Sequence, residues 1–248
     1  MPAPPDNLEP SHLALFLDVD GTLLDIKDHP ADVRADPTLI ALLQSLSKGL
    51  DGALSLISGR TVADIDRMFA PARFAAAGGH GAELRLHPDD RVSSSKWSLP
   101  ASILERMREF AAGASGLLLE EKGGGISLHY RRAPEFEEQC TTFVQSLLPE
   151  IEKDFRLIAG KMVFEFAPKE HHKGIAISEM MQRDPFTGRR SVFVGDDVTD
   201  EDGFRAVNAL GGITIRVGGS RGSEAEYSLP DVAAVHRWLE SIEQRIHQ

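Results

Sequence analysis

Cysteine is almost absent from this chain, since Cys140 is the only one among 248 residues. A lone cysteine cannot close a disulfide within the chain, so the fold needs no oxidising compartment. No apolar run is long enough to span a bilayer, and residues 1–10 show neither the basic start nor the apolar stretch of a secretion signal. We therefore expect a cytoplasmic protein without a membrane partner, with residues 1–10 as a short flexible lead.

An excess of basic residues is also missing. The chain has 27 lysines and arginines against 38 aspartates and glutamates, which gives a formal net charge of −11. Nucleic acids and anionic membranes reward basic surfaces, so the composition argues against both as general partners. Hydrophobic residues make up 42% of the chain, enough for one large α/β domain or two modest ones. No internal repeat or low-complexity tract is evident. The sequence leaves the oligomeric state open, and a monomer is plausible.

Three apolar runs in the first third of the chain end in polar or glycine-rich residues. They are Leu13–Leu17, Ala53–Ile57 and Phe74–Ala77, and helical spacing of apolar residues lies between them at Pro37–Leu46 and Val62–Phe69. Continuous apolar runs are typical of parallel strands buried on both faces. The pattern predicts a doubly wound sheet, which places its chemistry at the carboxyl ends of its strands.

The pattern changes between residues 82 and 168. Helical spacing at Ile103–Ala112 and Pro134–Leu148 alternates there with two pairs of strand-like segments. The pairs are Leu117–Glu121 with Gly125–Arg131, and Phe155–Ile158 with Lys161–Phe166. The order helix, hairpin, helix, hairpin predicts a small α+β domain.

The first pattern resumes after this segment. It predicts a helix at His171–Met181, a strand at Ser191–Val194, a helix from about Thr199 and a strand at Ile213–Val217. We assign no element beyond Val217. The predicted fold class is α/β: a doubly wound, mostly parallel core of residues 1–81 and 169–248, interrupted by an inserted α+β cap domain of residues 82–168.

Two carboxylates follow the first apolar run, in the sequence Asp18-Val19-Asp20-Gly21-Thr22. Asp18 can attack phosphorus as a nucleophile, while Asp20 protonates the leaving oxygen and later deprotonates water. Gly21 lets the backbone turn sharply beside a phosphate. Taken alone, such a segment is more often an acidic turn after a strand.

Ser58-Gly59-Arg60 follows the second apolar run. The Ser58 hydroxyl can hydrogen-bond a transferring phosphoryl group, Gly59 permits a tight turn, and Arg60 offers a charged fork to the substrate. The structural alternative is a helix cap formed by Ser58 or Thr61.

Lys173 and Asp196 complete the set of candidate catalytic and metal-binding residues. Lys173 begins the helix that re-enters the core, where it can offset the charge of a phosphoryl group, although a solvated lysine is the common alternative. Asp196 follows the strand at 191–194, and we assign Asp196, Asp18 and the main-chain carbonyl of Asp20 as ligands of Mg²⁺, which prefers oxygen donors. We expect Asp197 and Asp200 to orient waters or the lysine, and the other acids to favour a helix N-terminus.

These four elements, in this order and at strand ends, resemble the haloacid dehalogenase superfamily of phosphotransferases. Each motif alone is weak, but their combination is specific. An insert between the serine and lysine motifs is similar to the type C2 caps of that superfamily. The resemblance implies a magnesium-dependent phosphatase with an aspartyl-phosphate intermediate, and a cap that selects the substrate.

Further motifs are similar to those of trehalose-6-phosphate phosphatases. They are Gly79-His80-Gly81, Glu121-Lys122, Ser127–Arg131, Lys161–Glu165 and Gly195–Glu201, within a resemblance that runs from about Leu13 to Val217. The resemblance implies trehalose and phosphate as products. It also implies substrate contacts from His80, Lys122, His129, Arg131 and Glu165. Val19 and Phe166-Ala167-Pro168 depart from the family pattern, and the second departure touches the sugar pocket.

Other interpretations stay open at this stage. The same chemistry could serve another sugar phosphate, such as sucrose phosphate, mannosylglycerate phosphate or a hexose phosphate. A phosphoaccepting receiver-type signalling module also combines aspartate, magnesium and lysine, but it has no acid two residues beyond its acceptor and no inserted cap. A catalytically inactive regulator that binds a sugar phosphate is the third alternative.

Overall fold

The computed structural model describes residues 1–5, 8–26, 33–95, 98–122, 125–160, 162–219 and 222–247. The chain forms two compact units. The core unit combines Met1–Ser93 with His172–Gln248, and the inserted unit is the continuous segment Ser94–His171. Across the described ranges, every helix is too short or too polar to cross a bilayer.

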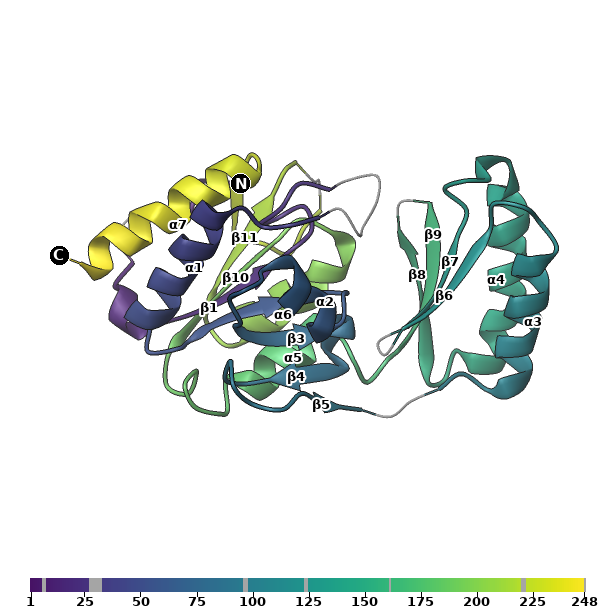
Figure 1. The fold of residues 1–248 in the computed structure, drawn as a ribbon, viewed down its shortest axis with the longest axis horizontal. Coiled ribbons are helices and arrows are strands. Elements are labelled where there is room, and N and C mark those ends of the chain that lie inside the picture. Colours follow the sequence, from purple (N-terminus) through teal and green to yellow (C-terminus); the bar gives the residue numbers. More distant parts are fainter. Residues whose placement is uncertain are drawn as a thin grey trace. The chain divides into compact units, whose positions relative to one another are not determined.

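The core unit is built on an eight-stranded sheet in the order β12-β11-β10-β1-β2-β3-β4-β5 (Figure 1). Neighbouring strands from β12 to β3 are parallel, and β4 pairs antiparallel with β3. Every residue of β1 and β2 is buried, which explains their continuous apolar sequences. The strands are β1 (Leu13–Asp18), β2 (Leu54–Ile57), β3 (Ala75–Gly78), β4 (Glu83–Arg85), β5 (Ser93–Ser94), β10 (Arg190–Gly195), β11 (Ile213–Val217) and β12 (Tyr227–Leu229).

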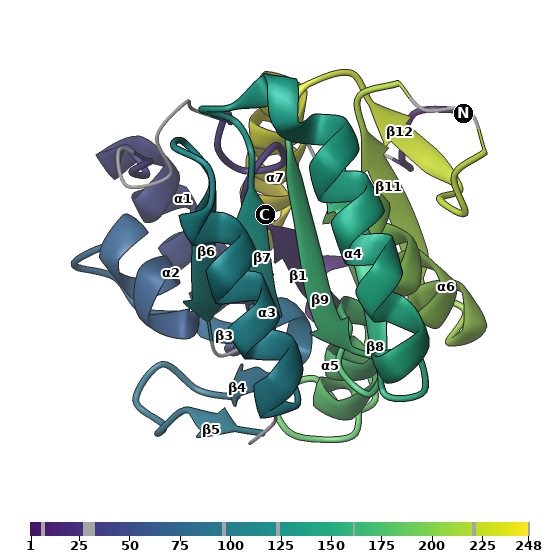
Figure 2. The same ribbon diagram turned by 90° about the vertical axis from the view of Figure 1, so that its right-hand side faces the viewer.

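Helices cover both faces of this sheet. They are α1 (Pro37–Gly49), α2 (Val62–Met68), α5 (Lys173–Met180), α6 (Glu201–Ala209) and α7 (Val232–Ile246). Figure 2 shows α1 and α2 on one side of the sheet and α6 on the other. Helix α7 packs against α1, and α5 packs against α6. The predicted α/β class with a doubly wound, mostly parallel core is confirmed.

The inserted unit has its own antiparallel sheet, in the order β6-β7-β9-β8. Helices α3 and α4 contact its strands and lie on one face of it (Figure 1). Buried side chains from the helices and from alternate strand positions form a core separate from that of the core unit. The predicted order of helix, hairpin, helix, hairpin is observed. The elements are α3 (Ala101–Ala112), β6 (Leu118–Lys122), β7 (Gly125–His129), α4 (Glu137–Ile151), β8 (Phe155–Gly160) and β9 (Val163–Pro168).

The boundaries of the two units differ from the expected 82 and 168. Residues 82–93 stay with the core unit because β4 extends the core sheet antiparallel to β3. The Arg85 side chain in β4 is fully buried and donates both to the Asp66 carboxylate and to the Phe74 carbonyl. A buried arginine in a three-residue strand gives no apolar pattern from which the strand could be predicted.

The expectation of a flexible lead at 1–10 is wrong for the residues described there. Pro4, Leu8 and Pro10 are buried, and the Pro2 carbonyl accepts a hydrogen bond of 2.9 Å from the Ser228 amide. Ser228 lies in β12, which the sequence analysis did not assign. Contacts with the C-terminal part of the core unit therefore hold the lead in place. Helix α7, in the same part of the chain, was also not predicted from the sequence.

Candidate active site

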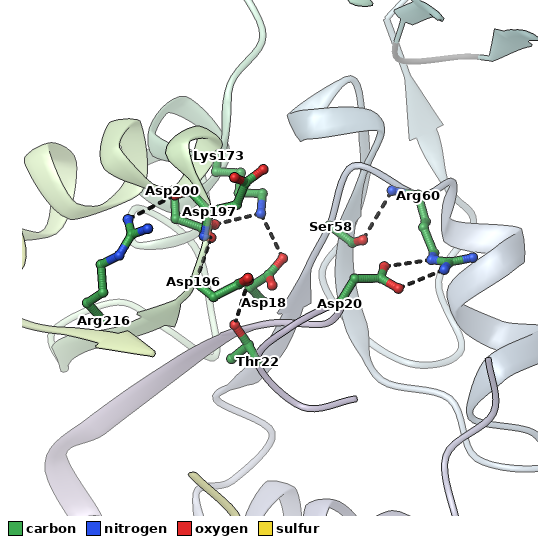
Figure 3. A network of polar contacts seen from close by, with 10 residues as sticks. All are labelled: Asp18, Asp20, Thr22, Ser58, Arg60, Lys173, Asp196, Asp197, Asp200 and Arg216. Atoms are coloured by element: carbon green, nitrogen blue, oxygen red, sulfur yellow. Dashed lines mark hydrogen bonds and ion pairs between the residues drawn. The ribbon is translucent and has the colours of Figure 1, made fainter. Parts of the chain in front are cut away.

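The carboxyl ends of three parallel strands meet at one edge of the core sheet (Figure 3). Asp18 ends β1 and is in register with Ile57, the last residue of β2, which Ser58 follows. On the other side of β1, β10 ends at Gly195, and Asp196 follows. Aspartate and serine side chains from distant parts of the sequence therefore project from the same edge.

Lys173 binds two buried carboxylates. Its Nζ donates to Asp18 Oδ1 at 2.7 Å and to Asp200 Oδ1 at 2.6 Å. The side chains of Lys173, Asp18 and Asp200 are 3%, 6% and 0% exposed. Buried charges are tolerated only when they are paired, so this lysine is part of the structure of the site rather than a solvated side chain.

Burial and neighbouring charges shift the ionisation of this group. Burial raises the pKa of Asp18 well above its ordinary value, and the charges of Asp200 and Asp196 add to the effect, although Lys173 opposes it. Burial alone would lower the pKa of Lys173, but the two carboxylates outweigh it and raise that pKa. The lysine is thus held as a cation beside the Asp18 carboxylate, whose negative charge is only partly compensated.

Asp200 connects the lysine to the loop after β10. Its Oδ2 accepts from the amides of Asp196 and Asp197, both at 2.9 Å, while its Oδ1 accepts from Lys173. Both oxygens of Asp200 are therefore engaged. The side chain fixes the loop that carries Asp196 relative to the lysine, which is the geometry expected of a residue that orients its neighbours.

Asp18, Asp196 and Asp200 form a cluster of acidic groups with the spacing of a candidate cation site. One ligand oxygen each from Asp18, Asp196 and Asp200 lies within 4.8 Å of the others. Among the described residues, the buried Asp18 Oδ2 has no hydrogen-bond partner. Burial, followed by the charge of Asp200, raises the pKa of Asp196 to about 6. An unpartnered oxygen and uncompensated negative charge suit a hard cation such as Mg²⁺.

The turn after β1 lies close to the Asp196 carboxylate. Gly21 has a φ of +88°, and a Cβ at this position would lie 2.1 Å from Asp196 Oδ2. The buried Thr22 hydroxyl donates to Asp196 Oδ1 at 3.3 Å. Glycine is required here both for the left-handed backbone and for the close approach of the carboxylate.

Asp20 is paired with Arg60 in the same region (Figure 3). Arg60 Nε donates to Asp20 Oδ2 at 2.6 Å, and Nη2 donates to Oδ1 at 2.7 Å. The Ser58 hydroxyl accepts from the Arg60 amide at 3.1 Å. The N-cap of α2 is Thr61, whose hydroxyl accepts from the Asp64 amide at 3.1 Å. Of the two helix-cap alternatives, the structure shows Thr61, so Ser58 is not used in this way.

The Gly79-His80-Gly81 segment supports the loop at 58–60. The His80 amide donates to the Ser58 carbonyl at 3.1 Å, and the Gly79 amide donates to the Arg60 carbonyl at 2.8 Å. His80 is 8% exposed, and its ring lies so close to Gly59 that a Cβ there would be 2.5 Å from Nε2. His80 therefore packs against the loop at 58–60, and a contact from it to the substrate stays a prediction.

Two predicted sugar contacts, His129 and Glu165, share one face of the inserted sheet. Ser127 of β7 pairs with Glu120 of β6 on one side and with Glu165 of β9 on the other. His129 is two residues from Ser127 and so faces the same way, while the alternate residues of β7 are buried in the unit's core. His129 Nε2 lies 3.1 Å from Glu120 Oε2. His129 and Glu165 thus lie on the same polar face of the sheet, and contacts from them to a sugar stay a prediction.

For the remaining predicted site residues, the structure gives the element and, where the side chain is described, the exposure. Arg131 lies beyond the end of β7 and is exposed, and Asp197 is exposed in the loop after β10. The backbone of Lys122 is in β6, but its side chain is outside the described part of the chain, as is the whole of Lys161.

Three residues that contact the candidate site residues had no role predicted from the sequence. Thr22 closes the motif Asp18–Thr22, and Glu120 directly precedes the quoted Glu121-Lys122, so both had a signal. Arg216 had none. Its Nη1 donates to Glu201 Oε1 at 2.7 Å and to the Asp197 carbonyl at 3.3 Å, which ties the loop after β10 to β11 and α6.

Known phosphatases are similar to this chain in sequence and in fold. A family model described as trehalose-phosphatase matches residues 16–233. A probable trehalose-phosphate phosphatase of Sinorhizobium fredii is 43% identical over 227 residues, which cover 90% of this chain and 84% of the relative. The trehalose-6-phosphate phosphatase of Escherichia coli is 39% identical over 236 residues, with 95% and 88% covered. The C-terminal domain of the C. albicans trehalose-6-phosphate phosphatase has the same fold, with a TM-score of 0.81 at 21% identity, covering 99% of this chain and 98% of that one. The chain belongs to the trehalose-phosphatase family.

Proposed function

We propose that this protein is a phosphoric monoester hydrolase that converts trehalose 6-phosphate to trehalose and phosphate through an aspartyl-phosphate intermediate. The observation that carries the proposal is the buried Asp18, held by Lys173 at the carboxyl end of β1. The relatives at 39% and 43% identity support the choice of substrate by their names. A cytoplasmic location remains part of the proposal.

In the first step, an Asp18 carboxylate oxygen attacks phosphorus. The bond between phosphorus and the sugar oxygen breaks, and its electron pair stays on that oxygen, which takes a proton from Asp20. Lys173 offsets the repulsion between the anionic nucleophile and the anionic ester, and the Ser58 hydroxyl hydrogen-bonds a phosphoryl oxygen. The products of this step are trehalose and phosphorylated Asp18.

In the second step, water attacks the phosphorus of phosphorylated Asp18. The Asp20 carboxylate accepts a proton from that water, the bond to Asp18 breaks, and phosphate is released. The proton given up in the first step is thereby recovered. Asp20 acts as acid and then as base, and Asp18 returns to its carboxylate form.

Asp18, Asp196 and the Asp20 main-chain carbonyl would hold Mg²⁺, with Asp197 and Asp200 orienting its surroundings. When bound, the cation supplies positive charge beside the phosphoryl group. Both oxygens of Asp200 are already engaged by Lys173 and by backbone amides, so Asp18 and Asp196 are left as the carboxylate donors. We further propose that His129 and Glu165, on one face of the inserted sheet, supply hydrogen bonds to the sugar.

Phosphate release from a panel of sugar phosphates tests the function. With Mg²⁺, we expect turnover of trehalose 6-phosphate to exceed that of sucrose phosphate, mannosylglycerate phosphate and glucose 6-phosphate. Chelation of the metal should abolish the activity. Equal rates on trehalose 6-phosphate and glucose 6-phosphate would contradict the disaccharide assignment.

The substitution Glu165→Ala adds a test within the inserted unit. It should lower kcat/KM for trehalose 6-phosphate about 10- to 100-fold, because sugar hydroxyls would lose a charged partner. Hydrolysis of p-nitrophenyl phosphate, which has no sugar, should change little. Glu135→Ala, at an exposed position of the same unit, is the matched control. A parallel loss on both substrates would argue against a sugar contact.

The substitution Asp196→Asn tests the metal site through stability. Because the pKa of Asp196 is raised to about 6, the folded protein binds its proton more tightly than the unfolded chain does. The ionised Asp196 therefore lowers the stability of the folded protein. This loss of stability is fully present above pH 6 and disappears as the pH falls toward the ordinary aspartate pKa of about 3.8. At pH 8 without metal, Asp196→Asn should therefore raise Tm by about 2–5 °C.

Asp196→Asn should also lose its phosphatase activity. In addition, Mg²⁺ should no longer raise its Tm, as it does for the unmodified protein. Scanning calorimetry at pH 8 and pH 5.5, with and without Mg²⁺, measures both effects. Asp89→Asn, at an exposed position of the core unit, is the control and should leave the magnesium response intact. A full magnesium response in Asp196→Asn would remove this residue from the ligand set.

A further inference from the structure

Arg60 was predicted to bind the substrate, but in the structure its guanidinium binds Asp20. Its Nε and Nη2 bind the two oxygens of the Asp20 carboxylate, at 2.6 and 2.7 Å. The arginine side chain is 14% exposed and that of Asp20 is 31% exposed. Two parallel charge-assisted hydrogen bonds fix both the position and the plane of a carboxylate.

The backbone of Arg60 is itself held from two sides. Its amide donates to the Ser58 hydroxyl at 3.1 Å, and its carbonyl accepts from the Gly79 amide at 2.8 Å. One residue later, Thr61 caps α2, and the Val62 amide donates to Glu83 Oε2 at 2.7 Å. The guanidinium therefore projects from a rigid segment between β2 and α2.

Asp20 needs such a partner for its chemistry. It lies in the turn after β1 and is more exposed than Asp18, which is buried against Lys173. A general acid must lie within about 2.6–3.2 Å of the oxygen that it protonates, so a rotating carboxylate would be a poor catalyst. We propose that Arg60 is the positioning residue of Asp20 rather than a ligand of the substrate phosphate. This inference rests on the proposed function, in which Asp20 is the acid and base.

The pairing of Arg60 with Asp20 affects proton transfer in both steps of the reaction. As a carboxylate, Asp20 can accept from both Arg60 nitrogens. As an acid, it donates from its protonated oxygen to the leaving group, while its other oxygen still accepts from Arg60 and keeps the carboxyl group in place. Arg60 therefore matters when Asp20 transfers a proton, and much less when Asp18 attacks an ester whose leaving group needs no proton.

Substrates with different leaving groups separate this role from phosphate binding. Arg60→Met should lower kcat on trehalose 6-phosphate about 10²- to 10³-fold, within the range of general acid–base catalysis. The pre-steady-state burst of p-nitrophenol from p-nitrophenyl phosphate should fall less than about 3-fold, because p-nitrophenolate leaves without protonation. Inhibition by inorganic phosphate should be unchanged. Arg60→Lys should fall between Met and the unmodified protein, since lysine cannot bind both oxygens.

A double substitution and a matched control complete the test. Asp20→Asn combined with Arg60→Met should be no slower on trehalose 6-phosphate than Asp20→Asn alone, because both remove the same function. Arg67→Met, an exposed arginine on α2, should behave as the unmodified protein. A multiplicative loss in the double variant, or a weaker phosphate inhibition in Arg60→Met, would overturn the proposal.

The outcomes distinguish this inference from the proposed function. If the unmodified protein releases phosphate from none of the sugar phosphates, the function itself fails. If it is active and Arg60→Met keeps full activity on sugar phosphates, the function stands and the positioning role of Arg60 fails.

Discussion

Replacing Asp18 with asparagine should lower kcat on trehalose 6-phosphate by about 10⁴-fold or more, because no other residue can take over the attack on phosphorus. The fold should survive. Asparagine keeps the shape and an acceptor oxygen for Lys173, and Asp200 still compensates the lysine charge. Phosphate release and far-ultraviolet circular dichroism measure the two expectations.

Asp25→Asn is a matched control for this change. Asp25 is exposed and lies only seven residues farther along the chain, so its substitution should leave the rate within about 2-fold of the unmodified protein. Retention of more than about one hundredth of the activity in Asp18→Asn would exclude Asp18 as the nucleophile.

Replacing Lys173 with methionine should damage both stability and activity. The side chains of Asp18 and Asp200 are 6% and 0% exposed, so removing the lysine leaves two buried carboxylates without their counter-ion. Breaking a buried pair in this way costs about 3–5 kcal/mol. The charge offset for the phosphoryl group is lost as well. Urea unfolding measures the first effect and phosphate release the second.

A second substitution separates these two effects. Lys173→Met combined with Asp200→Asn should recover part of the stability, because one uncompensated charge is removed and asparagine still offers an oxygen to the Asp196 and Asp197 amides. Activity should not return. Lys48→Met, at an exposed position of α1, is the control. An unchanged unfolding midpoint in Lys173→Met would contradict the buried pairing.

The core strands could be predicted because burial on both faces makes their sequences continuously apolar, as in β1 and β2. Asp18, Ser58 and Asp196 could be predicted to meet because each ends or follows a parallel strand. His129 was named through the family resemblance, and its place on the face of β7 opposite the buried Ile126 and Leu128 comes from the structure. Helix α7 also had a readable pattern, with Val235, Leu239 and Ile242 buried on one side, and it was overlooked.

Side-chain partners could not be predicted in the same way. Nothing in Ser58-Gly59-Arg60 indicates that the guanidinium turns to Asp20, because that pairing depends on how two loops approach each other. The antiparallel strand β4 and the Arg216 contact with Asp197 depend on the same kind of tertiary detail. The local sequence pattern predicts the helices and strands and their order, whereas tertiary packing determines the direction of long polar side chains.

The chain returns from the inserted unit to the core unit at His172, and Lys173 is the next residue. His172 is the N-cap of α5, and its ring nitrogen accepts from the Ile175 amide at 3.3 Å. This cap fixes where the helix starts, so the register of the lysine is set locally. An insertion or deletion within residues 94–171 can therefore leave the position of Lys173 in the core unit unchanged.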